Sequence, residues 1–196
     1  MVGDAEGESE VGDESAEDAS DVHTIGTDIY FQCEVTQRSV FKLIQQVRTL
    51  ETRLLTEAID LPGYAPSIRI FIRSDGGDIY AGYSAMDHLL DSKIRIVTVA
   101  DGLCASAGTL MLLGGRRRMM RKHSFVLIHQ LRSCFWGKFS ELRDGLAMCA
   151  QHMDMLKTTY TEHTKISPEK LKALMERDVL LTADECIEYG VVHSLV

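Results

Sequence analysis

Apolar residues recur along the chain with two periods, one typical of helices and the other of buried strands. Between Val40 and Ala58 they return every three or four residues, which predicts an amphipathic helix. Three short apolar runs, rich in β-branched residues, predict strands at 68–72, 94–100 and 125–128. Helical spacing separates these strands at 78–91 and 106–113. This alternation predicts an α/β fold with a parallel sheet and crossover helices.

More helices are expected after the third strand. Residues 138–164 form a long stretch of helical character. Ser167 followed by Pro168 is typical of a helix start, because proline fits the first helical position. A capping box that begins at Thr182 predicts one more short helix. The last expected strand is the pair Val191-Val192.

Charge is distributed unevenly over the 196 residues, whose formal net charge is −8. Residues 1–28 hold ten acidic side chains and no Lys or Arg, whereas the rest holds 19 acidic and 21 basic ones. An acidic segment with so few large apolar residues cannot offset its ordering entropy. We therefore expect residues 1–27 to form a disordered acidic tail and residues 28–196 to form one domain, with order beginning near Ile29.

Composition excludes several classes of protein. The basic run from Arg116 to Lys122 has no interleaved aromatic residues, so we interpret it as a solvated turn, or as a docking surface for an acidic partner, and expect no nucleic acid. No apolar run reaches the roughly 18 residues of a membrane-spanning helix. The five cysteines show no metal or disulfide spacing, which favours free thiols in the cytoplasm. The Asp75-Gly76-Gly77 segment lacks the lysine of a nucleotide-binding loop.

Three polar residues stand at the edges of apolar runs and carry the candidate chemistry. Ser106 lies between a predicted strand and a predicted helix, and His129 ends the strand at 125–128. Asp178 lies between the amphipathic segment that ends at Met175 and another apolar run. Catalytic groups in α/β sheets gather at the carboxyl ends of strands. A hydroxyl, an imidazole and a carboxylate are the parts of a serine nucleophile with its base.

Each of the three also has a purely structural interpretation. The small residues around Ser106 could simply let a helix pack closely on the sheet. His129 could be a hydrogen-bonded structural histidine, and Asp178 could cap a helix or a turn. Taken singly, these residues therefore leave the function open.

Five blocks, in order, resemble the proteolytic subunit of the Clp protease, a family with the ClpP/crotonase fold. The likeness extends from Ile29 to Val196. The blocks are Ile72–Gly77 with Ile79–Gly82, then Gly102–Gly108, Ile128–Gln130, Glu176–Asp178 and Ala183–Gly190.

This resemblance implies a fold of repeated β-β-α and βαβ units with a long handle helix. It implies Ser106 as the nucleophile, His129 as general base and acid, and Asp178 as the residue that orients His129. The backbone N–H groups of Gly77 and Ala107 would form the oxyanion hole.

The resemblance also implies a serine endopeptidase that encloses its active sites. In this family, heptameric rings stack into a tetradecamer, with contacts between rings that would include Arg177. A separate AAA+ unfoldase uses ATP and delivers unfolded proteins, whereas the subunit itself needs no metal and no cofactor.

The chain departs from the family's pattern in several places. Asp75 stands where the family has proline, and Leu131–Trp136 replaces a proline and a glycine-rich strand that holds substrate. The interval between Ser106 and His129 is slightly shorter than usual. The acidic tail replaces an N-terminal gating hairpin, and Arg69 replaces an aromatic residue of the groove that docks the ATPase.

Three other functions stay open at this point. The altered substrate strand would also suit a non-catalytic ring or scaffold subunit. The same fold would suit a crotonase-type enzyme that acts on acyl-CoA, although only Asp75 and Asp78 are candidate carboxylates near its glycine loop. A serine–lysine peptidase would take Lys122 as its base.

Overall fold

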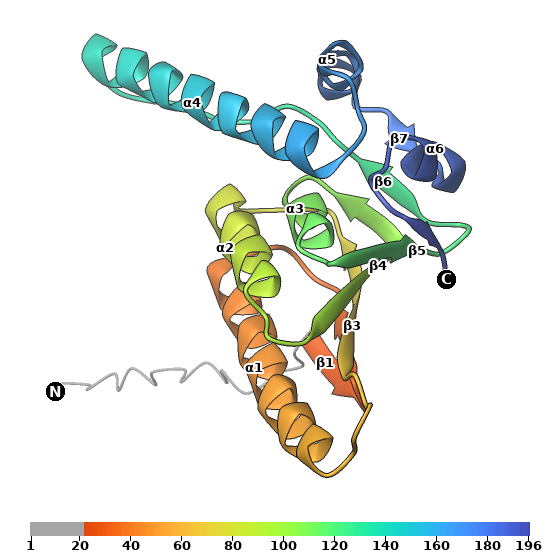
Figure 1. The fold of residues 1–196 in the computed structure, drawn as a ribbon. Helices are drawn as coiled ribbons and strands as arrows, with labels where there is room; N and C mark the ends of the chain where they lie inside the picture. The colour runs from red at the N-terminus through yellow and green to blue at the C-terminus, as the bar shows by residue number, and fades with distance from the viewer. Residues whose placement is uncertain (1–21) are drawn as a thin grey trace, which may run out of the picture.

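A mixed α/β architecture is seen in the computed structural model, which describes residues 22–196 (Figure 1). The strands of this described part form one eight-stranded sheet with the path β1-β2-β3-β4-β5-β8, to which β6 and β7 are added beside β4. The strands are β1 (Val22–Ile25), β2 (Asp28–Phe31), β3 (Ser67–Ser74), β4 (Arg95–Ala105), β5 (Arg117–Met120), β6 (Phe125–Leu127), β7 (Leu180–Leu181) and β8 (Ser194–Leu195). The helices are α1 (Gln37–Ile59), α2 (Ile79–Leu90), α3 (Ala107–Leu113), α4 (Phe139–His163), α5 (Pro168–Arg177) and α6 (Ala183–Glu188).

The centre of the sheet is parallel. Strands β2, β3 and β4 pair in parallel, and β4 then changes partner along its length. Its first half pairs with β5 and its second half with β6, again in parallel. Only β1 and β7, at opposite margins, pair antiparallel with their neighbours β2 and β6. The expected parallel pairing therefore holds for the central strands, whose apolar runs are buried on both faces.

Helices α1, α2 and α3 cover one face of the sheet (Figure 1). Leu43 of α1, Ile70 of β3 and Ile96 of β4 are fully buried in the core between them. A smaller cluster lies on the other face, where Phe71 packs with its neighbours and Tyr30 stacks on its ring at 4.8 Å between centroids. Packing on both faces holds the strands in place, and this fixes the positions of the residues that follow each strand.

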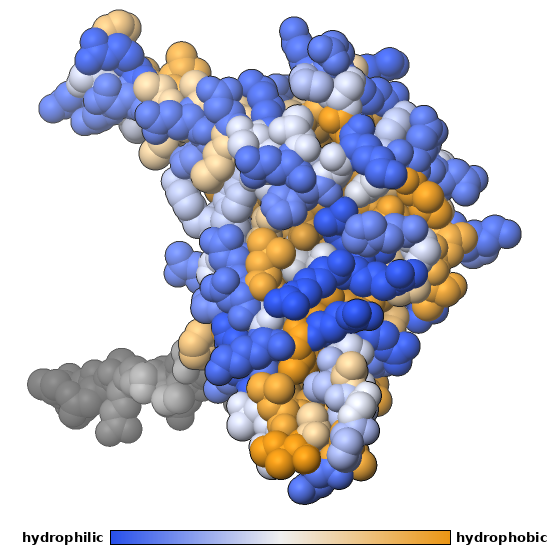
Figure 2. Space-filling view, viewed as in Figure 1, coloured by the Kyte–Doolittle hydropathy of each residue, from blue (hydrophilic) through white to orange (hydrophobic). Residues whose placement is uncertain are grey.

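The long helix α4 projects away from the sheet (Figure 1). Among its apolar residues, those near the sheet are buried, as at Leu156 and Tyr160, whereas Phe139 and Leu146 are 80% and 69% exposed. Figure 2 shows hydrophobic side chains among hydrophilic ones along this projecting part. The expected helix at 138–164 is therefore present. In its first half Gly145 packs against the ring of Phe135, whereas large apolar side chains such as Leu146 stay exposed.

One sequence expectation for the N-terminal part of the sheet, the boundary of the tail, needs correction. Residues 22–25, assigned to the tail, form β1 and pair with β2, so order begins before Ile29. Val22 is buried, and this apolar anchor gives the short strand its place in the core. The other part of the expected acidic tail, residues 1–21, lies outside the described residues.

The basic run is not a solvated turn over its whole length. Arg117–Met120 forms β5, and Arg118 is only 9% exposed. Its guanidinium donates hydrogen bonds to the carbonyl oxygens of Val191 (2.9 Å), His163 (2.7 Å) and Gly190 (3.0 Å). Three adjacent arginines hide a strand from any hydrophobicity pattern, because the inward one is satisfied by backbone carbonyls rather than by apolar contacts.

The C-terminal end differs in a smaller way. The last strand is Ser194–Leu195 instead of the pair at 191–192, both of which are buried in the core. Strand β7 has only two residues, too few to produce a recognisable pattern. None of the helices between residues 22 and 196 combines the length and the apolar character that crossing a bilayer requires.

Candidate active site

The carboxyl ends of β3, β4 and β6 lie at one edge of the sheet because the three strands run in parallel. Asp75, Ser106 and His129 follow these ends, and all three line one cavity of about 270 Å³. The lining is completed by residues of the glycine loop after β3, of α2, of α3, of the segment after His129 and of α4: Gly77, Ile79, Ala107, Leu110, Gln130, Leu131, Arg132, Leu156 and Tyr160. The topology thus brings together segments that are far apart in the sequence.

Ser106 is held in a strained turn between β4 and α3. Its φ is 54° and its ψ is −126°, values that L residues rarely adopt. Its N–H donates to the carbonyl of Leu127 at 3.0 Å, and its own carbonyl accepts from the N–H and the hydroxyl of Thr109 at 2.9 and 2.6 Å. Every residue of α3 is buried. The backbone around Ser106 therefore has little freedom, and the side chain stays at the cavity.

The glycine loop after β3 fits against Ser106 without room for side chains. A Cβ atom at Gly76 would meet the Cβ of Ser106 at 2.4 Å, and one at Gly77 would meet the carbonyl oxygen of Val35 at 2.3 Å. Both glycines also have positive φ, 104° and 145°. Val35 secures the loop from the other side, since its N–H donates to the Gly76 carbonyl and its carbonyl accepts from the Asp78 N–H, both at 2.8 Å.

Within residues 22–196, the backbone N–H groups of two residues beside Ser106 donate to no other backbone group. In the bridge to Val35 the hydrogen bonds use the Gly76 carbonyl and the Asp78 N–H, so the N–H of Gly77 points away from that bridge. Ala107 is the first residue of α3, where an N–H has no acceptor inside the helix. Both residues line the cavity beside Ser106. Two such donors could stabilise a negatively charged oxygen formed next to the serine.

His129 reaches the cavity, but its side-chain hydrogen bond is local. Its Nδ1 lies 2.6 Å from the carbonyl oxygen of Gln130. Because a carbonyl can only accept, Nδ1 carries the proton, and Nε2 of the neutral ring remains an acceptor. Within residues 22–196 no hydrogen bond joins His129 to Ser106 or to Asp178. The ring therefore has the tautomer that a general base needs, although its contacts with Ser106 and Asp178 are not formed.

Asp178 stands outside the cavity lining and has a different partner. It follows α5 in the left-handed conformation, with φ at 47°, and its side chain is 43% exposed. One carboxylate oxygen accepts a short hydrogen bond from the guanidinium of Arg132, which is itself 75% exposed. Of the three residues singled out from the sequence, the structure brings Ser106 and His129 to one cavity and leaves Asp178 paired elsewhere.

The far side of the cavity is apolar, and sequence reasoning missed its residues. Leu156 and Tyr160 come from the inner end of α4 and face Ile79 and Leu110 across the cavity. The Tyr160 hydroxyl makes a short hydrogen bond with the hydroxyl of Thr109, and burial raises the pKa of this tyrosine. Apolar residues on a long helix do not reveal from the sequence which of them line a site. Arg132 was missed as well, since nothing in its neighbourhood marked a partner.

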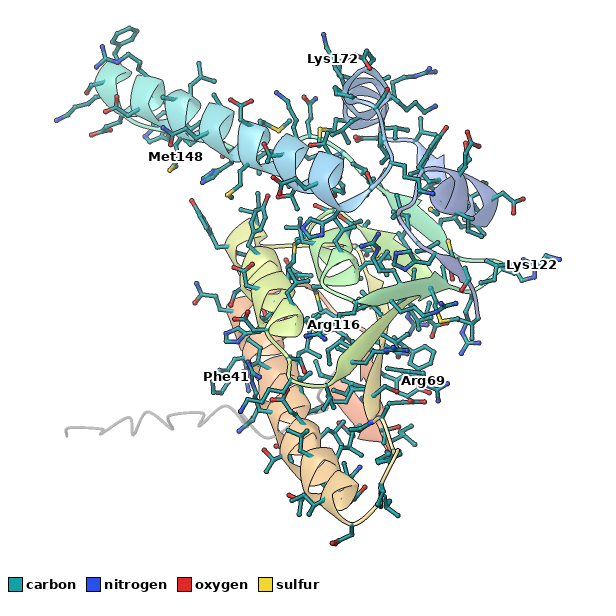
Figure 3. All side chains as sticks on the ribbon, viewed as in Figure 1. Phe41, Arg69, Arg116, Lys122, Met148 and Lys172 are labelled. Atoms are coloured by element: carbon teal, nitrogen blue, oxygen red, sulfur yellow. The ribbon has the colours of Figure 1, made fainter. Side chains whose placement is uncertain are left out.

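Lys122 lies in a different place from Ser106. It stands in the turn between β5 and β6 and points outward from the molecule (Figure 3). The cavity that it lines is formed by Asp101, Gly102, Arg121, His123, Ser124 and Val196, none of which lines the cavity of Ser106. This placement gives no support to a serine–lysine pair. Among residues 22–196, no cluster of three or more His, Cys, Asp or Glu side chains is arranged to hold a metal ion.

Comparison with known proteins gives one consistent match. The family described as "Clp protease" matches residues 26–196. A protein of Bacillus licheniformis, named ATP-dependent Clp protease proteolytic subunit 2, is 33% identical over 131 residues, which cover 66% of this chain and 69% of the relative. Proteins named ATP-dependent Clp protease proteolytic subunit are also similar: one from Deinococcus radiodurans is 28% identical, with 78% and 74% covered, and one from Bacteroides fragilis is 29% identical, with 84% and 86% covered.

Proposed function

The chain belongs to the Clp protease family, and from this premise we propose that it is a serine endopeptidase subunit whose nucleophile is Ser106. The observation that carries the proposal is the single cavity lined by Ser106, His129, Gly77 and Ala107. It unites a nucleophile, a base and two backbone donors. The family match favours peptide-bond hydrolysis over the acyl-CoA chemistry of a crotonase-type enzyme.

In the proposed reaction, Nε2 of His129 takes the proton of the Ser106 hydroxyl as its oxygen attacks a peptide carbonyl carbon. The carbonyl oxygen becomes an oxyanion, which the N–H groups of Gly77 and Ala107 stabilise. His129 then gives its proton to the leaving amine and leaves an acyl-serine. A water molecule, activated by the same imidazole, hydrolyses this ester. Asp178 orients His129 during these steps, and they need no metal or cofactor.

The apolar side of the cavity supports a preference among substrates. Ile79, Leu110 and Leu156 would surround the side chain next to the cleaved bond, and a charged side chain would lose hydration against these three apolar residues. We therefore propose that cleavage occurs after apolar residues of unfolded proteins or peptides.

The projecting part of α4 supports an assembly. Large apolar side chains such as Phe139 and Leu146 are exposed on it, and Trp136 just before it is fully exposed. Such a surface is costly in water and is typical of a protein interface. We propose that α4 is a handle through which heptameric rings stack into a tetradecamer, fed by an AAA+ unfoldase. Native mass spectrometry is expected to give a species at fourteen times the 21.9 kDa chain mass, and a monomer alone would contradict the assembly.

A second candidate function is a non-catalytic ring subunit. The observation that favours it is the pairing of Asp178 with Arg132, which leaves His129 without a carboxylate. Such a subunit would form rings but would resist every serine-directed probe.

The five free cysteines support a reducing, cytoplasmic setting for either candidate.

Hydrolysis of a short fluorogenic peptide with an apolar residue before the cleaved bond tests the proposed enzyme. The change Ser106→Ala is expected to remove hydrolysis, because no other hydroxyl occupies the cavity position of Ser106. Ser84→Ala on α2, outside the cavity, is the matched control and is expected to keep full activity. Full activity of the Ser106→Ala protein would refute the proposal, and an inactive wild-type ring would favour the second candidate.

A further inference from the structure

The carboxylate of Asp178 and the imidazole of His129 each have a substitute partner. Asp178 accepts from Arg132, and Nδ1 of His129 lies 2.6 Å from the Gln130 carbonyl. Arg132 comes three positions after His129, on the same segment beyond β6. This segment is tied to the end of α5, because the Gln130 N–H donates to the Met175 carbonyl at 3.1 Å. The arginine is therefore held where it can reach the turn that carries Asp178.

We propose that Arg132 is a positioning residue that competes with His129 for the carboxylate of Asp178. While Arg132 holds Asp178, the imidazole keeps the right tautomer through Gln130 but lacks a carboxylate to stabilise its protonated form. When the ion pair between Arg132 and Asp178 breaks, the carboxylate of Asp178 becomes available to Nδ1 of His129. This inference rests on the proposed function, since it assigns a control to the same site.

The carboxylate of Asp178 could pair with Arg132 or with His129. The chemistry of these two pairs supports a competition in which neither partner is strongly favoured. A guanidinium is always charged and presents donors in a rigid fork that suits a carboxylate. The Arg132–Asp178 pair is nevertheless exposed, at 75% and 43% of the two side chains, so water and salt weaken it. A pair of this kind can hold the carboxylate at rest and still release it readily. Arg132 also lines the cavity, so an extended substrate would meet its side chain directly.

The test compares the rate at which a fluorophosphonate labels the wild-type protein and the Arg132→Gln protein, together with kcat and KM for the fluorogenic peptide. Because an exposed ion pair is worth little, Arg132→Gln is expected to raise the labelling rate and kcat by about two- to fivefold, with a smaller change in KM. Arg132→Lys, which keeps the charge, is expected to stay closer to wild type. Arg143→Gln removes an arginine of similar exposure, 71%, from α4 and is the matched control.

A double variant separates positioning from other effects. In a protein with Asp178→Asn, the further change Arg132→Gln is expected to alter kcat less than twofold, because the contested carboxylate is gone. In a wild-type protein that is labelled, the same rise with and without Asp178, no rise at all, or an equal rise in the Arg143→Gln control would each overturn the role of Arg132.

The outcome remains decisive even if the protein is inactive. Labelling that disappears with Ser106→Ala supports the proposed enzyme independently of Arg132. If no variant is labelled, crystal structures of the wild-type and Arg132→Gln proteins decide, since the proposal expects Asp178 within hydrogen-bond distance of His129 Nδ1 in the variant. An Asp178 that stays turned away in the Arg132→Gln structure would overturn the competition, whatever the activity.

Discussion

Ser106 stands on a turn enclosed by β6, α3 and the glycine loop, whereas Asp178 stands on an exposed turn after α5 with one arginine as its side-chain partner. The first position leaves no space for even a methyl group at Gly76. The second is 43% exposed and can change partner without disturbing the core.

This difference separates two requirements of acyl transfer. A nucleophile and its oxyanion donors must be held within a fraction of an ångström, since misplacement by about 1 Å can cost a hundredfold in rate. In the proposed competition, a single exposed contact, between Arg132 and Asp178, would instead control the orientation of His129. The chain accordingly builds the region of Ser106 from the core of the sheet and leaves the carboxylate of Asp178 exposed on its margin.

The largest expected effect tests how tightly the glycine loop packs against Ser106. Gly76→Ala is expected to lower peptide hydrolysis by about a hundredfold or more, because its Cβ would displace Ser106, whose Cβ lies 2.4 Å away. Gly63→Ala is the matched control, since Gly63 also has a positive φ, 88°, but has open space around it. The control shares the backbone strain and is expected to keep the activity. Equal activities of the two variants would show that Ser106 is not held as tightly as the comparison requires.

The second effect concerns Arg118, which links β5 to the end of α4 and to the segment after α6. Arg118→Gln is expected to lower the free energy of unfolding by about 2–4 kcal/mol, because two buried carbonyls and one partly buried carbonyl lose a charged donor. One of them belongs to His163, the last residue of α4. Chemical denaturation measures the change, with Arg117→Gln as control, since Arg117 is exposed and bonds only the Ser194 hydroxyl. A difference between the variants below about 0.5 kcal/mol would contradict a structural role for Arg118.

The smallest effect concerns Glu51 of α1, which is buried and accepts hydrogen bonds from Ser92 and Lys93, just before β4 begins. Burial raises the pKa of Glu51, but hydrogen bonds from Arg48, the Ser92 hydroxyl and the Lys93 N–H outweigh it, so this pKa lies below its usual 4.5. The unfolded chain therefore binds the proton more readily than the folded one. The stabilisation from the ionised carboxylate is fully present above the unfolded value and is lost as pH falls through the lowered folded value.

Glu51→Gln is accordingly expected to cost about 1–2 kcal/mol of stability at pH 7 and progressively less in acid. Denaturation curves at pH 7 and below pH 4 measure the two costs. Glu57→Gln, on the exposed side of the same helix, serves as control because its pair with Arg53 is half exposed and should change little. A cost of Glu51→Gln that stays constant across this range would contradict a buried, ionised carboxylate.

Much of the fold could be predicted from the sequence because its main elements have strong periods. The helices at 40–58, 78–91 and 138–164 and the central strands appear with small shifts in their ends. The strand β5 could not be found, because its inward Arg118 is satisfied by carbonyls from the distant C-terminal region. The strand β1 is short and follows an acidic segment, which concealed its single anchor Val22.

The candidate site also contains some features that could be predicted from the sequence and others that could not. Ser106 and His129 follow directly after apolar runs, and parallel topology then brings them to one edge, so their shared cavity could be expected. The pairing of Asp178 with Arg132 could not, because it depends on the path of the chain after β6 rather than on any local pattern. The roles of Ser106, His129 and Asp178 in catalysis stay predictions until they are tested by activity.

Mass spectrometry of the full-length protein after reaction with a fluorophosphonate tests the central claim most directly. The account predicts one adduct per chain, on the peptide that contains Ser106, and none after Ser106→Ala. An adduct on another residue, or a protein that assembles and hydrolyses peptides while Ser106 stays unmodified, would contradict it.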